Sequence, residues 1–151
     1  MKNKVEYGWA FLDLFRHRIK QLDPKDFDCV VGILRGGSIP ATIASHELDL
    51  PIYWVVAKSY DKDNVKRKVI DINALFSKLP SKGVRSRVLL CDDVWDTGAT
   101  ITGVEALLSD DYNAKCRSFV LVTKDTAAPV DWVFDGKKQT WFVFPWEKQG
   151  K

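Results

Sequence analysis

The sequence predicts an α/β fold in which helices flank a mainly parallel, twisted sheet. Apolar runs with the length of buried strands alternate along the chain with segments of helical periodicity, and this alternation is typical of a parallel sheet. The chain has 151 residues, of which 46% are hydrophobic, and this is enough for a core without disulfide or metal support. No repeat, linker or low-complexity segment interrupts the pattern, so we expect one domain over residues 1–151.

The first half of the chain provides two predicted helices and two predicted strands. Apolar residues recur at helical spacing over residues 9–22, and Pro24 ends that pattern. Residues 27–34 form an almost unbroken apolar run, which indicates a strand buried on both faces. Pro40 suits the first turn of a helix that ends near residue 48. Residues 52–57 are rich in β-branched and aromatic side chains, which predicts the next strand.

The second half continues the alternation after a polar segment. Residues 59–67 are mostly polar and charged, so we expect an exposed loop or a mobile hairpin there. The pattern of residues 69–79 is ambiguous. The remaining predicted elements are a strand at 87–91, a helix at 100–108, a strand at 119–123 and short strands at 132–134 and 141–144.

Charge and composition narrow the function classes. The formal net charge is only +3, which is too small to indicate nucleic-acid binding and mildly favours phosphorylated small molecules. No apolar run has the length of a membrane span, and the N-terminal residues lack the apolar core of a signal peptide. The three cysteines have no metal-ligand spacing, which fits small core residues in a reducing compartment. We therefore expect a cytoplasmic protein without nucleic-acid or integral membrane contacts.

Ligands of parallel sheets bind at the carboxyl ends of the strands. The loops at these ends are predicted to begin at Arg35, Ser59, Asp92 and Lys124. The third loop carries the strongest signal, because residues 88–100 join a buried strand, three acids and the start of a helix.

The acids of this loop and the helix that follows them have different chemical uses. Asp92 and Asp93 suit the hydroxyl groups of a sugar, or a metal ion held near them. Adjacent side chains of a strand point to opposite faces, so both acids can serve one ligand only if the strand ends at this point, as we expect. Residues 97–100 open a helix whose unpaired N–H groups can bind phosphate, and Gly98 allows close approach. The alternative is a capped helix with solvated acids.

The spacing of these residues resembles the signature of type I phosphoribosyltransferases: acids at 92, 93 and 96, followed by Thr-Gly-Ala-Thr. Three further segments resemble the bacterial xanthine-guanine group of that family, in the same order along the chain. They are the pyrophosphate loop at 35–40, the start of the mobile catalytic loop at 59–64, and the base-binding end at 139–141 and 145–147. The resemblance covers nearly the whole chain and implies a small base-binding hood made by the terminal segments.

The resemblance also implies an activity. A phosphoribosyl group would pass from phosphoribosyl pyrophosphate to guanine, xanthine or hypoxanthine, with Mg²⁺ as the cofactor and pyrophosphate as the second product. Asp92 and Asp93 would be catalytic residues that hold the ribose hydroxyls, and Asp93 would lie nearest the metal. The residues implied to cradle the 5′-phosphate are Thr97, Gly98, Ala99 and Thr100.

Pyrophosphate would be bound by two loops of the related enzymes. Arg35 and the N–H groups of Gly36 and Gly37 would contact it, and the Leu34–Arg35 peptide would be cis. Ser59 and Tyr60 are assigned to the start of the mobile loop. Either Lys66 or Arg67 of that loop would reach the pyrophosphate. Without the resemblance, the two segments fit a simple turn and a solvated charged face.

The purine base would lie between the acidic loop and the chain's C-terminal end. Asp96 would be catalytic and assist proton transfer near N7 of the base. Lys124 would donate to the oxygen at C6, Trp141 would stack on the ring, and Phe142 would offer backbone groups to its edge. The alternative for these aromatic residues is a place in the core.

The chain departs from the related pattern at several positions, including the longer stretch from Asp96 to Lys124, and other functions remain open. Trp95 is large for a spacer position, and Ala99 replaces a frequent glycine. One alternative is a phosphoribosyltransferase for another base. The other is a non-catalytic regulator of the same fold that binds phosphoribosyl pyrophosphate or a nucleotide. The resemblance further implies a homodimer or homotetramer.

Overall fold

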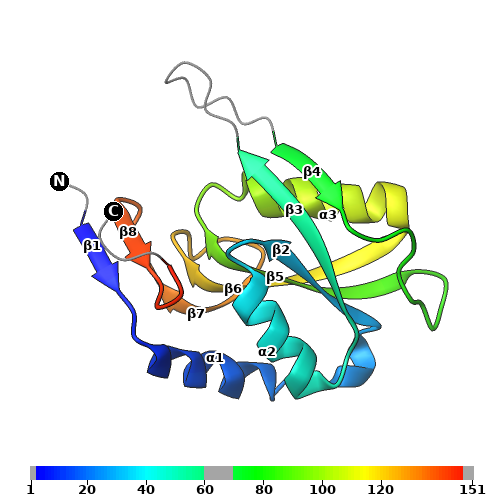
Figure 1. Cartoon of the computed structure of the whole chain (residues 1–151), viewed down its shortest axis with the longest axis horizontal. Coiled ribbons are helices and arrows are strands. Elements are labelled where there is room, and N and C mark those ends of the chain that lie inside the picture. The colour runs from blue at the N-terminus through cyan, green and yellow to red at the C-terminus, as the bar shows by residue number, and fades with distance from the viewer. Residues whose placement is uncertain (1–2, 60–69, 148–151) are drawn as a thin grey trace.

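The computed structural model describes residues 3–59 and 70–147 and confirms the predicted fold class (Figure 1). Within these residues, the main sheet has six strands in the order β4-β3-β2-β5-β6-β7. Strand β4 is antiparallel to β3, and the other neighbours are parallel. The strands are β2 (Cys29–Leu34), β3 (Ile52–Ser59), β4 (Ile70–Ala74), β5 (Ser86–Trp95), β6 (Ala114–Thr123) and β7 (Asp131–Asp135).

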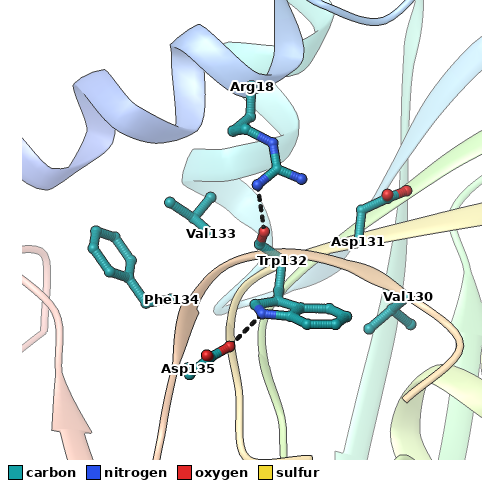
Figure 2. Close-up of a pocket in the computed structure, with 7 residues that line it drawn as sticks. All are labelled: Arg18, Val130, Asp131, Trp132, Val133, Phe134 and Asp135. Atoms are coloured by element: carbon teal, nitrogen blue, oxygen red, sulfur yellow. Dashed lines mark hydrogen bonds between the residues drawn. The ribbon is translucent and has the colours of Figure 1, made fainter. Parts of the chain in front are cut away.

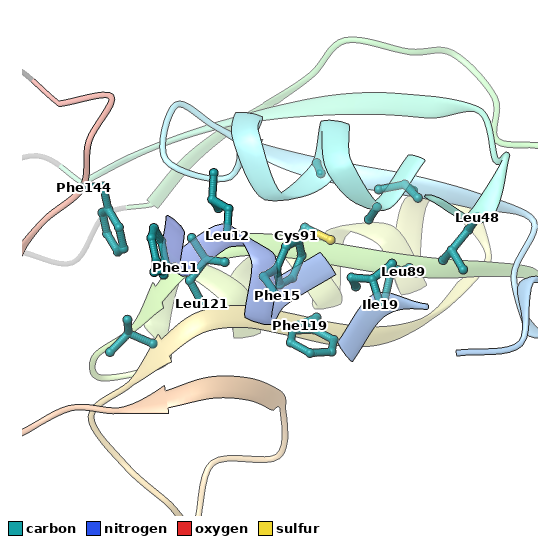
Figure 3. Close-up of a cluster of buried hydrophobic side chains, with 14 of the residues drawn as sticks. Phe11, Leu12, Phe15, Ile19, Leu48, Leu89, Cys91, Phe119, Leu121 and Phe144 are labelled. Carbon is teal, nitrogen blue, oxygen red and sulfur yellow. The ribbon is translucent and has the colours of Figure 1, made fainter. Parts of the chain in front are cut away.

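Helices cover both faces of this sheet. Helices α1 (Leu12–Ile19) and α2 (Ser38–Leu48) lie on one face, and α3 (Ala99–Tyr112) lies on the other (Figure 1). Alternate side chains of β5 point to opposite faces of the sheet. Leu89 packs in the core under α1 and α2, which Figure 3 shows, and Leu90 packs in the core under α3. In the described part of the chain, no helix is long and apolar enough to cross a membrane.

The terminal segments form a second, smaller sheet, as predicted for the hood. Strand β1 (Asn3–Glu6) pairs in parallel with β8 (Thr140–Val143). Tyr7 joins this sheet to the core, because its N–H donates to the carbonyl of Val143 at 2.9 Å and its ring stacks on Phe11, with 4.8 Å between centroids. The strand β1 was not predicted, since its four residues are exposed and mostly polar.

Several elements differ in extent from the sequence predictions. The predicted helix at 9–22 is a 3-10 turn, Trp9–Phe11, followed by the shorter α1. Strand β5 does not end at residue 91 but continues to Trp95, because it stays paired with β6 as far as Thr123. Helix α3 and strand β6 are both longer than predicted, and the ambiguous segment at 69–79 contains β4.

An ion pair between the buried Asp28 and Arg87 joins the start of β2 to β5, and we expect it to make stability depend on pH. The Asp28 carboxylate accepts hydrogen bonds from the N–H and guanidinium of Arg87, at 2.8 to 3.3 Å, and from the N–H of Lys82. Hydrogen bonding to Arg87 lowers the pKa of Asp28 below its ordinary value. The resulting stabilisation is complete above about pH 4 and is lost as the pH falls through the lower folded-state pKa.

The substitution Asp28→Asn should therefore lower the free energy of unfolding by about 1–3 kcal/mol at neutral pH, towards the lower figure because Arg87 is partly exposed. Urea unfolding of both proteins from about pH 7 to about pH 2 measures this. The difference between them should shrink in the acidic range. An equal difference at every pH would contradict the role assigned to the carboxylate charge.

Candidate active site

The sheet order places a ligand site between β2 and β5. From β2 the chain passes through α2 to β3 on one side, and from β5 it passes through α3 to β6 on the other. Such a reversal leaves a crevice at the carboxyl ends of the two strands, which is where open α/β sheets bind ligands. The loops that enter this crevice are residues 35–37 and residues 96–98, two of the loops that the sequence singles out.

Asp92 and Asp93 lie at this crevice inside β5, not after its end as predicted. Asp92 is 7% exposed, and its Oδ1 accepts the N–H of Asp93 at 2.9 Å. Asp93 in turn accepts the N–H of Val94 at 2.7 Å. The register with β6 is the same on both sides of Asp93, from Asp92↔Val120 to Val94↔Val122. The two carboxyl groups interact with each other, although adjacent strand side chains normally diverge.

Burial raises the pKa of both acids. For Asp92 the neighbouring charge of Asp93 adds to the effect of burial. For Asp93 the added charge is that of Glu147, which lies beyond β8 and was not among the predicted site residues. Two neighbouring acids that resist ionisation favour a partner that stabilises their charge, such as a cation or a set of hydroxyl groups.

The loop after β2 packs directly against Asp93. A β-carbon on Gly36 would lie closer than 3 Å to the carboxylate oxygens of Asp93, so a larger residue here would displace that carboxylate. The Gly37 N–H donates to the carbonyl of Ile33 at 2.7 Å, which turns the loop sharply at the end of the strand. The Leu34–Arg35 peptide is cis, as predicted. The structure thus brings the predicted pyrophosphate loop and the predicted ribose acids together.

The predicted phosphate cradle begins helix α3. Gly98 precedes the helix with a φ of 82°, a conformation that favours glycine. The N–H of Ala99 points to Oγ1 of Thr97 at 3.4 Å. Like any helix start, this one leaves N–H donors of the first turn, including that of Thr100, available to an anion. The indole of Trp95 lies against Gly98, so Trp95 belongs to the core under this loop.

The predicted base-binding residues also gather, at the far side of the acidic loop. The Lys124 ammonium is 3.3 Å from Oδ2 of Asp96 and 5.8 Å from the ring centroid of Phe142. The Lys124 side chain is 12% exposed and that of Asp96 is 63% exposed, so the acid is the more accessible member of the pair. Phe142 is buried, and its ring faces Lys124. Its backbone contacts to the base stay a prediction. Trp141, next to it on β8, is 55% exposed.

Other predicted residues and an open pocket lie outside this group. Tyr60 and Lys66 fall outside the described residues, as does the side chain of Ser59. A pocket of about 470 Å³ follows β7 (Figure 2). There Arg18 donates to the carbonyl of Trp132 at 3.1 Å, and none of the predicted site residues lines it.

The acids fit a magnesium ion that is shared with a substrate. The described residues contain no group of three or more potential ligands that could hold a metal on their own. Mg²⁺ is usually bound by one or two carboxylates together with substrate phosphate oxygens and water. Asp93 and Asp92 supply such carboxylates beside a loop and a helix start suited to phosphate.

The fold and the site define an α/β protein built to bind a phosphorylated sugar. Residues 8–149 match the phosphoribosyl transferase domain, and the chain belongs to this family. The transfer of a phosphoribosyl group is the chemistry of the class.

Solved structures resemble the chain over nearly its full length. The purine phosphoribosyltransferase of Pyrococcus horikoshii is 28% identical, with a TM-score of 0.78 over 98% of this chain and 97% of that chain. The xanthine-guanine-hypoxanthine phosphoribosyltransferase of Helicobacter pylori is 22% identical, with a TM-score of 0.75 over 96% of this chain and 94% of that chain. A hypothetical protein of Neisseria gonorrhoeae with bound ppGpp is 22% identical, with a TM-score of 0.71 over 99% and 92%.

Proposed function

We propose that the chain, as one domain, is a Mg²⁺-dependent purine phosphoribosyltransferase that joins the phosphoribosyl group of phosphoribosyl pyrophosphate to a 6-oxopurine. The observation that carries the choice of base is the group formed by Lys124, Asp96 and Phe142 beside the ribose acids. An ammonium group donates hydrogen bonds only, so it suits a carbonyl oxygen and not the amino group of adenine. The likeness to the P. horikoshii purine phosphoribosyltransferase supports a purine as the base.

The proposed reaction exchanges pyrophosphate for a base nitrogen at C1 of the ribose. The bond from C1 to the pyrophosphate oxygen breaks, the bond to nitrogen forms, and the base loses a proton. The helix start at Thr97–Thr100 and the loop with Arg35 and Gly36 hold the two phosphate ends, while Asp92 and Asp93 bind the ribose hydroxyls. Their negative charge stabilises the cationic sugar of the transition state. Bound Mg²⁺ supplies charge neutralisation of the leaving group.

Asp96 and Lys124 have different roles towards the base. Asp96 is accessible and takes the proton that the purine loses, a contribution typically worth about 10²–10⁴-fold. Lys124 donates to the oxygen at C6 and is kept in place by Asp96 and the Phe142 ring. Trp141 is exposed on the hood strand β8 and supplies the stacking surface. Ser59, Tyr60 and Lys66 belong to the proposal as parts of the loop that excludes water.

Pyrophosphate release tests the proposed function. Phosphoribosyl pyrophosphate and Mg²⁺ are mixed with guanine, xanthine, hypoxanthine or adenine, and both pyrophosphate and nucleotide are measured. We expect release only with the 6-oxopurines. The variant Lys124→Gln should lose about tenfold or more in kcat/KM for these bases, the value of a charged hydrogen bond, with a smaller change in KM for phosphoribosyl pyrophosphate. Release with adenine alone would overturn the choice of base.

The second candidate is a regulator of the same fold. The N. gonorrhoeae structure with bound ppGpp shows that a protein of this fold binds a guanine nucleotide. Binding of a nucleotide or of phosphoribosyl pyrophosphate, without pyrophosphate release for any base, would favour this candidate. Analytical ultracentrifugation tests the homodimer or homotetramer that we also propose.

A further inference from the structure

Trp95 occupies an unusual place beneath the proposed phosphate cradle. It ends strand β5, is 8% exposed, and belongs to the apolar core under α3. A β-carbon on Gly98 would lie closer than 3 Å to three atoms of the indole ring, Cε2, Cζ2 and Cη2. The α-carbon of Gly98 therefore rests on the indole, and the ring limits how far the loop can move towards the sheet.

The position of Gly98 sets the direction of the first turn of α3. It is the last residue before the helix, its φ is 82°, and its carbonyl accepts the N–H of Thr102 at 2.9 Å. A small rotation at this residue would redirect the N–H groups of the turn, including that of Thr100. Charged hydrogen bonds to an anion depend strongly on such geometry.

The backbone of Trp95 has a second contact, on the side of the base. Its carbonyl accepts the N–H of Lys124 at 2.9 Å. The side chain of Trp95 thus contacts the cradle, while its backbone holds the residue that is proposed to recognise the base. A change of side chain alone disturbs the first contact and leaves the second in place.

We infer that Trp95 is a positioning residue that orients the N–H groups at the start of α3 towards the 5′-phosphate of the substrate. This inference rests on the proposed function. A residue that only filled the core would influence stability without distinguishing between the two substrates. A positioning residue changes the affinity for the phosphorylated sugar selectively, because the base contacts of Lys124 and Asp96 do not depend on the indole.

Steady-state kinetics of Trp95→Leu and Trp95→Phe test the inference. We expect KM for phosphoribosyl pyrophosphate to rise about tenfold in Trp95→Leu, the loss of one charged hydrogen bond. The rise should be smaller in Trp95→Phe, which keeps an aromatic ring. In both variants, KM for the base should change less than about twofold. The matched control is Leu108→Ala, in the same core at the other end of α3, which should lower the melting temperature but leave both KM values unchanged.

Titration calorimetry with ribose 5-phosphate gives a readout independent of turnover. Wild-type protein that binds this ligand, with weaker binding by Trp95→Leu and unchanged binding by Leu108→Ala, supports the inference. Equal binding by wild type and both Trp95 variants overturns it and leaves the proposed function intact. Wild-type protein that binds neither ribose 5-phosphate nor phosphoribosyl pyrophosphate overturns the proposed function and the inference with it.

Coupling to Gly98 provides a second test that does not require Trp95→Leu to be highly stable. Gly98→Ala should weaken binding of ribose 5-phosphate in the wild-type background, because its β-carbon meets the indole. In the Trp95→Leu background the same substitution should have a smaller effect, although the φ of 82° still opposes alanine. Equal effects in the two backgrounds would contradict the contact on which the inference depends.

Discussion

Replacing Gly36 with alanine should lower kcat/KM by about a hundredfold while changing the free energy of unfolding little, since a misplacement of about 1 Å in a catalytic group can have an effect of that size. The three atoms nearest to the added β-carbon all belong to the carboxylate of Asp93. A carboxylate at the end of a side chain can rotate away at modest cost. It would then leave the position from which it is proposed to bind the ribose and the metal.

Two other glycine substitutions separate this effect from a general loss of stability. Gly83→Ala adds a β-carbon with no atom within 4 Å, so activity and stability should both stay near wild type. Gly37→Ala meets the backbone carbonyls of Cys91 and Ile33, which cannot rotate away. It should therefore destabilise the fold by about 1–3 kcal/mol or more. Full activity of Gly36→Ala, or a stability loss as large as that of Gly37→Ala, would contradict the prediction.

The elements that could be predicted from the sequence are those that are buried on both faces. The apolar runs that became β2 and the inner half of β5 have no other favourable place than the middle of a parallel sheet. Strand β1 gave no such signal, because its residues are exposed and it is held by pairing with β8. Residues that are ordered by a distant partner do not show this in their own pattern.

The end of β5 was predicted wrongly for a related reason. Three acids within five residues are typical of a loop, since burial of charge is unfavourable. In the structure Asp92 stays within the strand because it accepts a neighbouring N–H, and the strand remains paired with β6 to Trp95. Local composition does not reveal a carboxyl group that is kept in a sheet by its own backbone contacts.

The candidate site was predicted as separate segments, and their contacts came from the fold. The approach of Gly36 to Asp93 and the charge of Glu147 near that acid both join residues far apart in the sequence. The contact between the Trp95 indole and Gly98 depends on how the loop turns into α3. From the sequence, only the large size of Trp95 at a spacer position could be noted. Spacing predicts which residues carry chemistry, and the three-dimensional structure shows which of them position the others.

Asp93→Asn should have the largest effect on activity of the acid substitutions, and it should also make the protein more stable. Removing the charge that binds the metal and the ribose is expected to lower turnover by about 10²–10³-fold, the size seen when one transition-state contact is removed. Activity measured against Mg²⁺ concentration should shift to higher concentrations of the ion. The surface substitution Asp110→Asn, at the exposed end of α3, is the matched control and should leave both properties unchanged.

The gain in stability follows from the direction of the pKa of Asp93. Burial and the charge of Glu147 raise this pKa, so the folded protein holds the proton more tightly than the unfolded chain. Stability that depends on Asp93 is therefore lost as the pH rises above about 4, the value in the unfolded chain, and through the folded-state pKa. Asparagine keeps an oxygen for the N–H of Val94 and carries no charge. Without ligand at neutral pH, Asp93→Asn should unfold at a higher temperature than wild type, and added phosphoribosyl pyrophosphate with Mg²⁺ should stabilise the wild type more than the variant. A variant that is less stable than wild type in the absence of ligand would show that the Asp93 carboxylate stabilises the fold. It would contradict the prediction that the charge proposed to bind the ribose and Mg²⁺ destabilises the unliganded protein.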